Sequence, residues 1–205
     1  MKKLLFLLLL CPLMVMAEDF YPATITYMDG TTRTGFANIP AMQIYKLKFK
    51  ETAKGKVEKI DNSLLKSMEL IDKKGKKMSF VALRWSNWSN WSKKFIFDEK
   101  KSWAQIIKQG KVSYVIYYSY ESVNTRGGYD NHIWIEGDDF SYGYFVTLGG
   151  FTISVGYFDA FETKSKFIFE KDCPEMIKKI TKKEFEKKGI EYLTELYDEN
   201  CGSTK

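Results

Sequence analysis

The sequence predicts a mainly β domain: an antiparallel meander that forms a curled sheet or two packed sheets, capped by a short C-terminal helical segment. Three observations support this fold class. Of the 205 residues, 44% are hydrophobic and 16% are aromatic, which is the composition of a globular protein and excludes a disordered chain. Turn signals recur about every eight to twelve residues through most of the chain. Helix-capping motifs begin only at Asp172.

Residues 1–17 are expected to be a secretory signal peptide. Two lysines precede the apolar run Leu4–Met16, and Val15-Met16-Ala17 places small residues ahead of a cleavage position. The run is shorter than a membrane-spanning helix, which needs about 20 residues. The alternative to a signal peptide is a buried N-terminal helix. Cleavage leaves one exported domain, residues 18–205, whose net charge falls from +6 to +4 because two lysines are lost. We expect a periplasmic or extracellular location, with no stable membrane span in the mature chain.

Cys11 offers a second interpretation of this segment, in which the protein is a lipoprotein anchored through that cysteine. A lipoprotein signal would place a small residue before the cysteine, whereas Leu10 precedes it here. We therefore favour cleavage after Ala17.

The mature chain retains two cysteines, Cys173 and Cys201. Export would place them in an oxidising compartment, where one intramolecular disulfide is the expected pairing. The bridge would close a loop of about 29 residues and contribute roughly 3.5 kcal/mol in the chain-entropy model. Two unrelated buried thiols are the alternative.

The predicted β-rich body covers residues 20–170 and opens with a hairpin. Thr24–Met28 and Thr31–Ala37 are its strands, and Asp29-Gly30 forms the turn because both residues tolerate positive φ. Residues Tyr45–Lys50 then alternate between apolar residues, which would face the core, and three lysines. We interpret the lysines as a solvated face that discourages edge pairing, and a row of ligand-binding lysines is the alternative.

Further strands are predicted along the rest of the body, at Val57–Ile60, Met78–Leu83, Phe95–Phe97, Val112–Tyr120, Ile133–Ile135, Phe140–Leu148, Phe151–Val155 and Lys166–Phe169. Leu64–Ile71 fits either a strand or a helix. Trp103–Ile107 is expected to form one helical turn that ends at Gly110.

The helical tail is predicted over residues 172–199. Asp172 is the expected N-cap of a first helix, with Pro174 in the first turn and Glu175 completing a capping box. Thr181 begins a second helix, and Gly189 suits its end. Ile190–Tyr197 forms a third.

The pattern resembles a group of uncharacterised exported proteins of Gram-negative bacteria. The residues that carry the resemblance are Asp29-Gly30 before Gly35-Phe36, the lysine-rich strand that ends at Phe49, and Gly110-Lys111-Val112 at the start of an aromatic strand. The most specific is the tail, from Asp172-Cys173-Pro174 to Cys201. The resemblance implies a small β-rich domain with a C-terminal helical segment. It implies no activity, so no catalytic residue is transferred.

The segment Arg84–Ser92 repeats Trp-Ser-Asn with a period of three, which places Trp85, Trp88 and Trp91 at equal spacing. Neither a strand nor an α-helix would align the three indoles, whereas a polyproline-like or 3₁₀ loop would. Aligned and exposed, they could stack on sugar rings. We favour a loop folded back so that indoles cover the core, with Trp88 pointing inward.

Other candidate chemistry is weaker. His132 lies beside Asp130 and could act as a general base, but no nucleophile motif accompanies it, so we interpret it as a histidine of a loop or strand edge. Asp138-Asp139 with Glu136 could bind calcium, although such residues more often form a solvated turn. We therefore expect no cofactor, no metal and no catalytic residues. The mild net charge does not indicate nucleic-acid binding.

These observations lead to one main functional hypothesis and two others. The main hypothesis is a non-enzymatic exported protein that acts by binding a protein or a cell-envelope component. The alternative is a carbohydrate-binding module that uses Trp85, Trp88 and Trp91 to hold a glycan. A hydrolase that uses His132 is the third.

Overall fold

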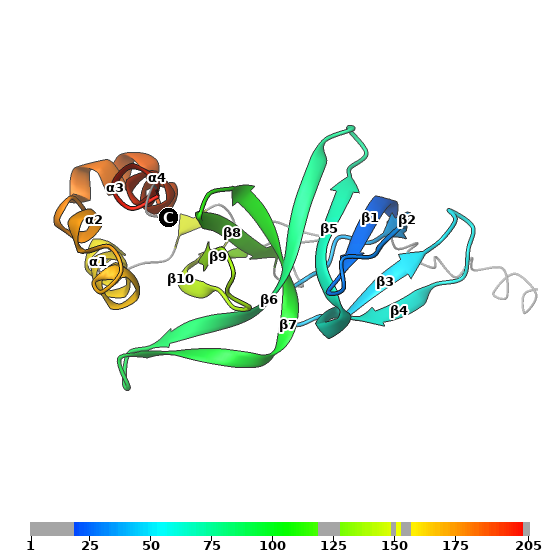
Figure 1. Ribbon diagram of the computed structural model, residues 1–205, viewed down its shortest axis with the longest axis horizontal. Coiled ribbons are helices and arrows are strands. Elements are labelled where there is room, and N and C mark those ends of the chain that lie inside the picture. The colour runs from blue at the N-terminus through cyan, green and yellow to red at the C-terminus, as the bar shows by residue number, and fades with distance from the viewer. Residues whose placement is uncertain (1–18, 119–127, 149–150, 153–156, 203–205) are drawn as a thin grey trace, which may run out of the picture.

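The computed structural model describes residues 19–118, 128–148, 151–152 and 157–202. The expected signal peptide, Cys11 and the cleavage position after Ala17 lie outside these residues. The described residues form an antiparallel β structure followed by four helices, which confirms the predicted fold class (Figure 1). None of the described helices has the length and apolar character needed to cross a membrane.

Among the described residues, eleven strands form one sheet, which is not closed, in the order β11-β10-β9-β8-β7-β6-β5-β1-β2-β3-β4. The strands are β1 (Tyr21–Tyr27), β2 (Thr32–Ala37), β3 (Lys46–Lys50), β4 (Glu58–Asp61), β5 (Leu65–Ile71), β6 (Lys77–Ser89), β7 (Lys94–Lys108), β8 (Val112–Tyr118), β9 (Tyr129–Ile135), β10 (Tyr142–Leu148) and β11 (Phe151–Thr152). A short 3₁₀ helix, η2 (Asn62–Leu64), precedes β5. The meander is interrupted once, because β1 lies between β5 and β2.

The predicted N-terminal hairpin and the alternating strand are both present. Gly30 has φ 85° in the turn between β1 and β2, a conformation that glycine adopts without steric cost. In β3, Leu47 and Phe49 are fully buried while the neighbouring lysines point away from the core. Strand alternation therefore places the hydrophobic residues of both elements on the core side.

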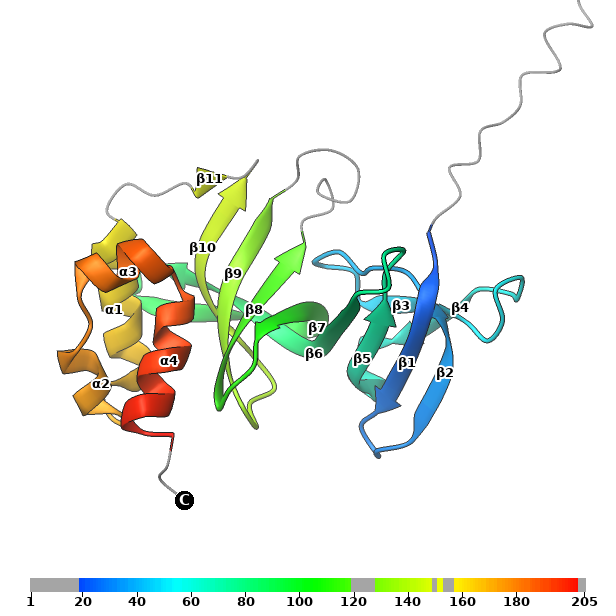
Figure 2. The same ribbon diagram turned by 90° about the horizontal axis from the view of Figure 1, so that it is seen from above.

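The sheet forms two curled parts that share β6 and β7, and each has its own hydrophobic core. The core of the N-terminal part is formed by β1–β5 together with residues of β6 and β7, and it includes Ile25, Phe49 and Trp103. The core of the C-terminal part lies between β8–β10 and the helices and includes Phe161 and Phe185. Figure 2 shows the helices as a layer at one end of the molecule, against β8–β10, with β1–β4 at the other end.

The helical layer consists of α1 (Tyr157–Phe169), α2 (Pro174–Lys178), α3 (Lys182–Lys188) and α4 (Glu191–Asn200). Thr181 is the N-cap of α3, since its hydroxyl accepts a hydrogen bond from the Glu184 amide, and Gly189 with φ 64° ends that helix. The expected N-cap of α2 is wrong: Cys173 occupies that position, and its side chain makes no capping bond. Cys173 and Cys201 form the expected disulfide, which joins the start of α2 to the end of α4.

Two predicted elements are wrong. Lys166–Phe169 is the last turn of α1, in which Phe161, Ser165 and Ile168 recur at helical spacing on the buried face. Trp103–Ile107 belongs to strand β7 and not to a helical turn. Its residues 102–105 are all buried because both faces of this part of the sheet are covered, so the strand lacks the usual alternation.

Candidate functional site

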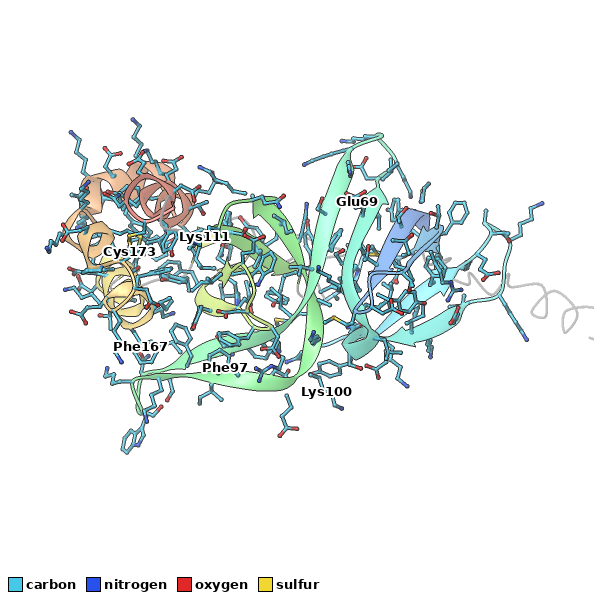
Figure 3. All side chains as sticks on the ribbon, viewed as in Figure 1. Glu69, Phe97, Lys100, Lys111, Phe167 and Cys173 are labelled. Carbon is cyan, nitrogen blue, oxygen red and sulfur yellow. A yellow bond between two sulfur atoms is a disulfide. The ribbon has the colours of Figure 1, made fainter. Side chains whose placement is uncertain are left out.

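A pocket of about 730 Å³ lies where the two parts of the sheet meet. One wall is formed by β3, β4 and the segment that leads into β3. The other wall is formed by β6, β7 and the turn before β10. Figure 3 shows Lys100 where β7 passes η2 and the end of β4. We call this site the lysine pocket.

Positive charge dominates the lysine pocket. Its lining contains six cationic and three acidic side chains: Lys46, Lys48, Lys59, Arg84, Lys100 and Lys101 against Asp61, Glu99 and Asp139. Strand pairing brings the lysines of β3 and β4 together, because Lys48 lies directly across from Lys59. Lysines from neighbouring strands and from β7 therefore converge on one cavity, which is a suitable arrangement for an anionic ligand.

Two of the three carboxylates are already engaged within the protein. Asp139 accepts two hydrogen bonds from Arg84, from Nε at 3.1 Å and from Nη2 at 2.8 Å. Asp61 accepts from the amide of Ser63 at 3.0 Å and from its hydroxyl at 2.8 Å. The Arg84 bonds lower the pKa of Asp139, and the Ser63 bonds lower that of Asp61.

The lysines of the pocket are less fully paired. Among the residues that the structure describes, Lys46, Lys59 and Lys100 have no carboxylate within ion-pair distance. The ammonium of Lys100 lies 5.2 Å from the centre of the Tyr45 ring, a cation–π contact at the pocket wall. These three ammonium groups remain available to a ligand.

Asp98 organises the wall behind the lysines. Its Oδ2 accepts hydrogen bonds from the Tyr45 hydroxyl at 3.0 Å and from Trp85 Nε1 at 2.7 Å, and its Oδ1 accepts from the Lys100 amide at 3.1 Å. Burial acts to raise the pKa of Asp98, but these hydrogen bonds outweigh it and hold the pKa below its ordinary value. The ionised carboxylate thus fixes the orientation of Tyr45, whose ring lines the pocket.

The three tryptophans of the repeated segment lie in three different environments. They do not form a polyproline-like or 3₁₀ loop, because Trp85 and Trp88 belong to strand β6 and only Trp91 lies in the turn that follows. Trp85 packs near Val81 and Leu83, and Trp88 contacts the core beneath the helices. Trp91 is 98% exposed. The structure therefore does not bring the three indoles together as one surface for stacking on a sugar.

Trp88 belongs to an aromatic cluster that ties the β6–β7 hairpin to α1 and β10. Its ring centroid lies 5.0 Å from that of Phe95 and 5.4 Å from that of Phe167, both in edge-to-face geometry. Phe95 also contacts Tyr142 at 5.0 Å. Trp88 thus has a structural role, since its ring in β6 contacts rings of β7 and α1.

His132 lies in the middle of β9, between β8 and β10, so its expected position in a loop or at a strand edge is wrong. It is 1% exposed, and its Nδ1 lies 3.1 Å from the Ser141 hydroxyl, which is itself fully buried. Burial, with a contribution from the charge of Lys164, lowers the pKa of His132 to about 3. The imidazole is therefore neutral at physiological pH and closed off from solvent.

The acidic turn that could have bound calcium has another role, since Asp139 pairs with Arg84. Within the described part of the chain, no three His, Cys, Asp or Glu side chains are grouped so that they could hold a metal ion.

Part of the lysine pocket is visible in the sequence. The Lys46-Lys48-Lys50 row is recognisable, and a ligand-binding lysine row is one interpretation of it. Two of these lysines, Lys46 and Lys48, line the pocket. The contribution of Arg84, Lys100 and Lys101 has no sequence signal, because they are far from β3 along the chain and are brought near it only by the sheet topology.

Comparisons with family models, with curated proteins and with solved structures find no match to this chain.

Proposed function

We propose that this is a non-enzymatic exported binding protein that takes an anionic group of a cell-envelope component into the lysine pocket. The observation that carries the proposal is the charge of the lining, in which six cations face three carboxylates and two of these carboxylates are already hydrogen-bonded. Lys46, Lys59 and Lys100 could donate charge-assisted hydrogen bonds to phosphate or carboxylate oxygens.

Export and the absence of enzymatic activity are parts of the same proposal. The Cys173–Cys201 disulfide is typical of proteins that mature in an oxidising compartment. The resemblance to uncharacterised exported proteins of Gram-negative bacteria agrees with this location. A low pKa and burial make His132 a poor general base, which supports a binding function over hydrolysis.

A matched pair of small ligands tests the proposal. Isothermal titration calorimetry would compare glucose 1-phosphate with glucose, which differ in the anionic group. We expect binding of the phosphorylated sugar only, and we expect affinity to fall with added salt because the attraction is electrostatic. Equal binding of both sugars would favour the carbohydrate-binding alternative, and binding of neither would count against a small anionic ligand.

A double variant and its control locate the site. Lys46→Ala/Lys100→Ala should weaken binding by about tenfold or more, since a hydrogen bond to a charged group contributes about 1.5–3 kcal/mol. Lys54→Ala/Lys56→Ala removes the same charge from exposed positions in the loop between β3 and β4, outside the pocket. This control should bind as the unmodified protein does. Equal losses in both variants would show that only net charge matters and would contradict a defined site.

A further inference from the structure

The tip of the β6–β7 hairpin presents one tryptophan that makes almost no contact with the rest of the chain. The last strand pair is Ser89 with Lys94, and the four residues between them form the turn. Trp91 in this turn is 98% exposed. Exposure of a whole indole to water is unfavourable, because an aromatic side chain of this size is among the residues that gain most from burial.

The turn that carries Trp91 has a defined structure. The Lys93 amide donates a hydrogen bond to the Ser89 carbonyl at 2.9 Å, and the Ser92 amide donates to the Ser89 hydroxyl at 3.2 Å. Lys93 adopts φ 52°, the left-handed conformation that closes the turn. The hairpin near the tip is in turn held against α1 by the contact between Trp88 and Phe167. Trp91 is therefore presented on a supported projection.

The tip lies away from the centre of the molecule. Figure 1 shows the β6–β7 hairpin extending beyond the sheet below the helices, and Figure 3 shows Phe167 of α1 beside its end. Phe167 is 53% exposed, so a second aromatic surface accompanies Trp91 at this end of the molecule.

Positive charge flanks the exposed indole. Lys93 and Lys94 are both exposed, and neither forms an ion pair with any residue that the structure describes. The other turn residues, Asn90 and Ser92, are uncharged. The tip thus combines an amphipathic ring with two cations and carries no carboxylate of its own.

This combination matches the surface of an anionic phospholipid bilayer. Tryptophan concentrates at the membrane–water interface, where its ring contacts lipid and its N–H remains hydrated. Lysines near an anionic leaflet are attracted to the headgroups. A protein interface needs about 800 Å² on each partner and surrounds its anchor residue with further contacts. A narrow turn of polar residues provides little such area, whereas a fluid bilayer closes around a single projection.

We propose that the hairpin tip docks the protein on anionic phospholipid membranes, with Trp91 in the interfacial layer and Lys93 and Lys94 at the headgroups. This interaction is separate from the lysine pocket, which lies towards the other end of the hairpin.

Vesicle cosedimentation tests the proposal with the purified protein. We expect binding to vesicles that contain phosphatidylglycerol and little binding to vesicles of phosphatidylcholine alone. Trp91→Ser should weaken vesicle binding by about tenfold, and Lys93→Gln/Lys94→Gln should weaken it about fivefold for each lysine removed. Because Trp91 is exposed, circular dichroism should show that Trp91→Ser folds like the unmodified protein.

Two controls separate the tip from other surfaces. Ile96→Ser removes an apolar residue that is 63% exposed on the same hairpin but not in the turn, and it should bind vesicles normally. Lys46→Ala/Lys100→Ala should also bind normally, which distinguishes this interaction from binding in the lysine pocket. The proposal is overturned if the unmodified protein does not bind anionic vesicles. It is equally overturned if the Trp91→Ser variant binds these vesicles as well as the unmodified protein does. It is also overturned if a photo-crosslinker at position 91 captures one envelope protein while vesicle binding is absent.

Discussion

The five tryptophans of this chain differ so much in burial that replacing them one at a time should give a graded series of stabilities. We consider Trp103→Ala, Trp88→Ala and Trp91→Ala. Trp103 is 1% exposed, and its Nε1 donates a hydrogen bond to Asn62 Oδ1 at 3.0 Å. Trp88 is half-buried in the aromatic cluster, and Trp91 is 98% exposed.

The expected magnitudes follow from these environments. Trp103→Ala should lower the free energy of unfolding by about 3–5 kcal/mol from lost burial and cavity formation, with more lost because a buried Asn62 oxygen loses its partner. Trp88→Ala removes two edge-to-face ring contacts, each contributing about 0.5–1.5 kcal/mol beyond area burial, together with a half-buried surface. We expect a loss of about 2–3 kcal/mol. Trp91→Ala should change stability by less than about 0.5 kcal/mol.

Urea unfolding followed by circular dichroism measures this series, and it avoids tryptophan fluorescence, which each variant alters. The reasoning would be refuted if Trp91→Ala lost as much stability as Trp88→Ala. It would also be refuted if Trp88→Ala were neutral, because the hairpin would then not be held to α1 by this ring. Either result would mean that the Trp88 and Trp91 side chains are not buried and exposed, respectively, as in the structure.

Two further predictions concern the helical layer and a buried carboxyl group. Cys201→Ala should lower the free energy of unfolding by about 3.5 kcal/mol, from the loop of about 29 residues that the disulfide closes. Thiol titration of the denatured, unreduced mature protein, which lacks Cys11, should find no free thiol, and two titratable thiols would contradict the bridge. Burial raises the pKa of Asp130 to about 6, so the folded state holds its proton more tightly than the unfolded state does, and stability falls as pH rises from about 4 to about 6. Asp130→Asn should therefore be more stable than the unmodified protein by up to about 3 kcal/mol near pH 7, and this difference should disappear near pH 4. Chemical unfolding of both proteins at the two pH values measures the difference. A difference that is the same at both pH values would contradict the prediction.

The elements that could be predicted are those in which local pattern and tertiary environment agree. The Asp29-Gly30 turn, the alternation in β3 and the Thr181 and Gly189 caps of α3 each depend on neighbouring residues alone. Leu64–Ile71 fits a strand or a helix by its sequence. From Leu65 onward it is strand β5, because β1 and β6 pair with its two sides. That choice depends on residues far away in the chain.

The incorrect elements are those in which tertiary burial replaces the expected pattern. Residues 102–105 of β7 are buried on both faces, so no alternation marks them as a strand. Lys166–Phe169 is a short apolar run rich in phenylalanine, which suits a strand. Only the longer spacing from Phe161 shows a helix. The period of three in the tryptophan segment likewise did not determine its structure, because pairing with β7 imposes a strand conformation on Trp85 and Trp88.

The candidate site was predictable only in part, for the same reason. Lys46 and Lys48 could be recognised because they alternate with buried residues in one strand. Their convergence with Lys100 requires β7 to pass β3, β4 and η2, which depends on the order of the whole sheet.

Because β6 and β7 contribute to both cores, the two parts of the sheet are not separate structural units. Phe80 and Trp103 of these strands belong to the N-terminal core, whereas Phe95 belongs to the core beneath the helices. The core of each part therefore depends on residues of β6 and β7, which the core of the other part also requires. We therefore expect that loss of order in one part removes structural support from the other. We expect the two parts to unfold in a single cooperative transition.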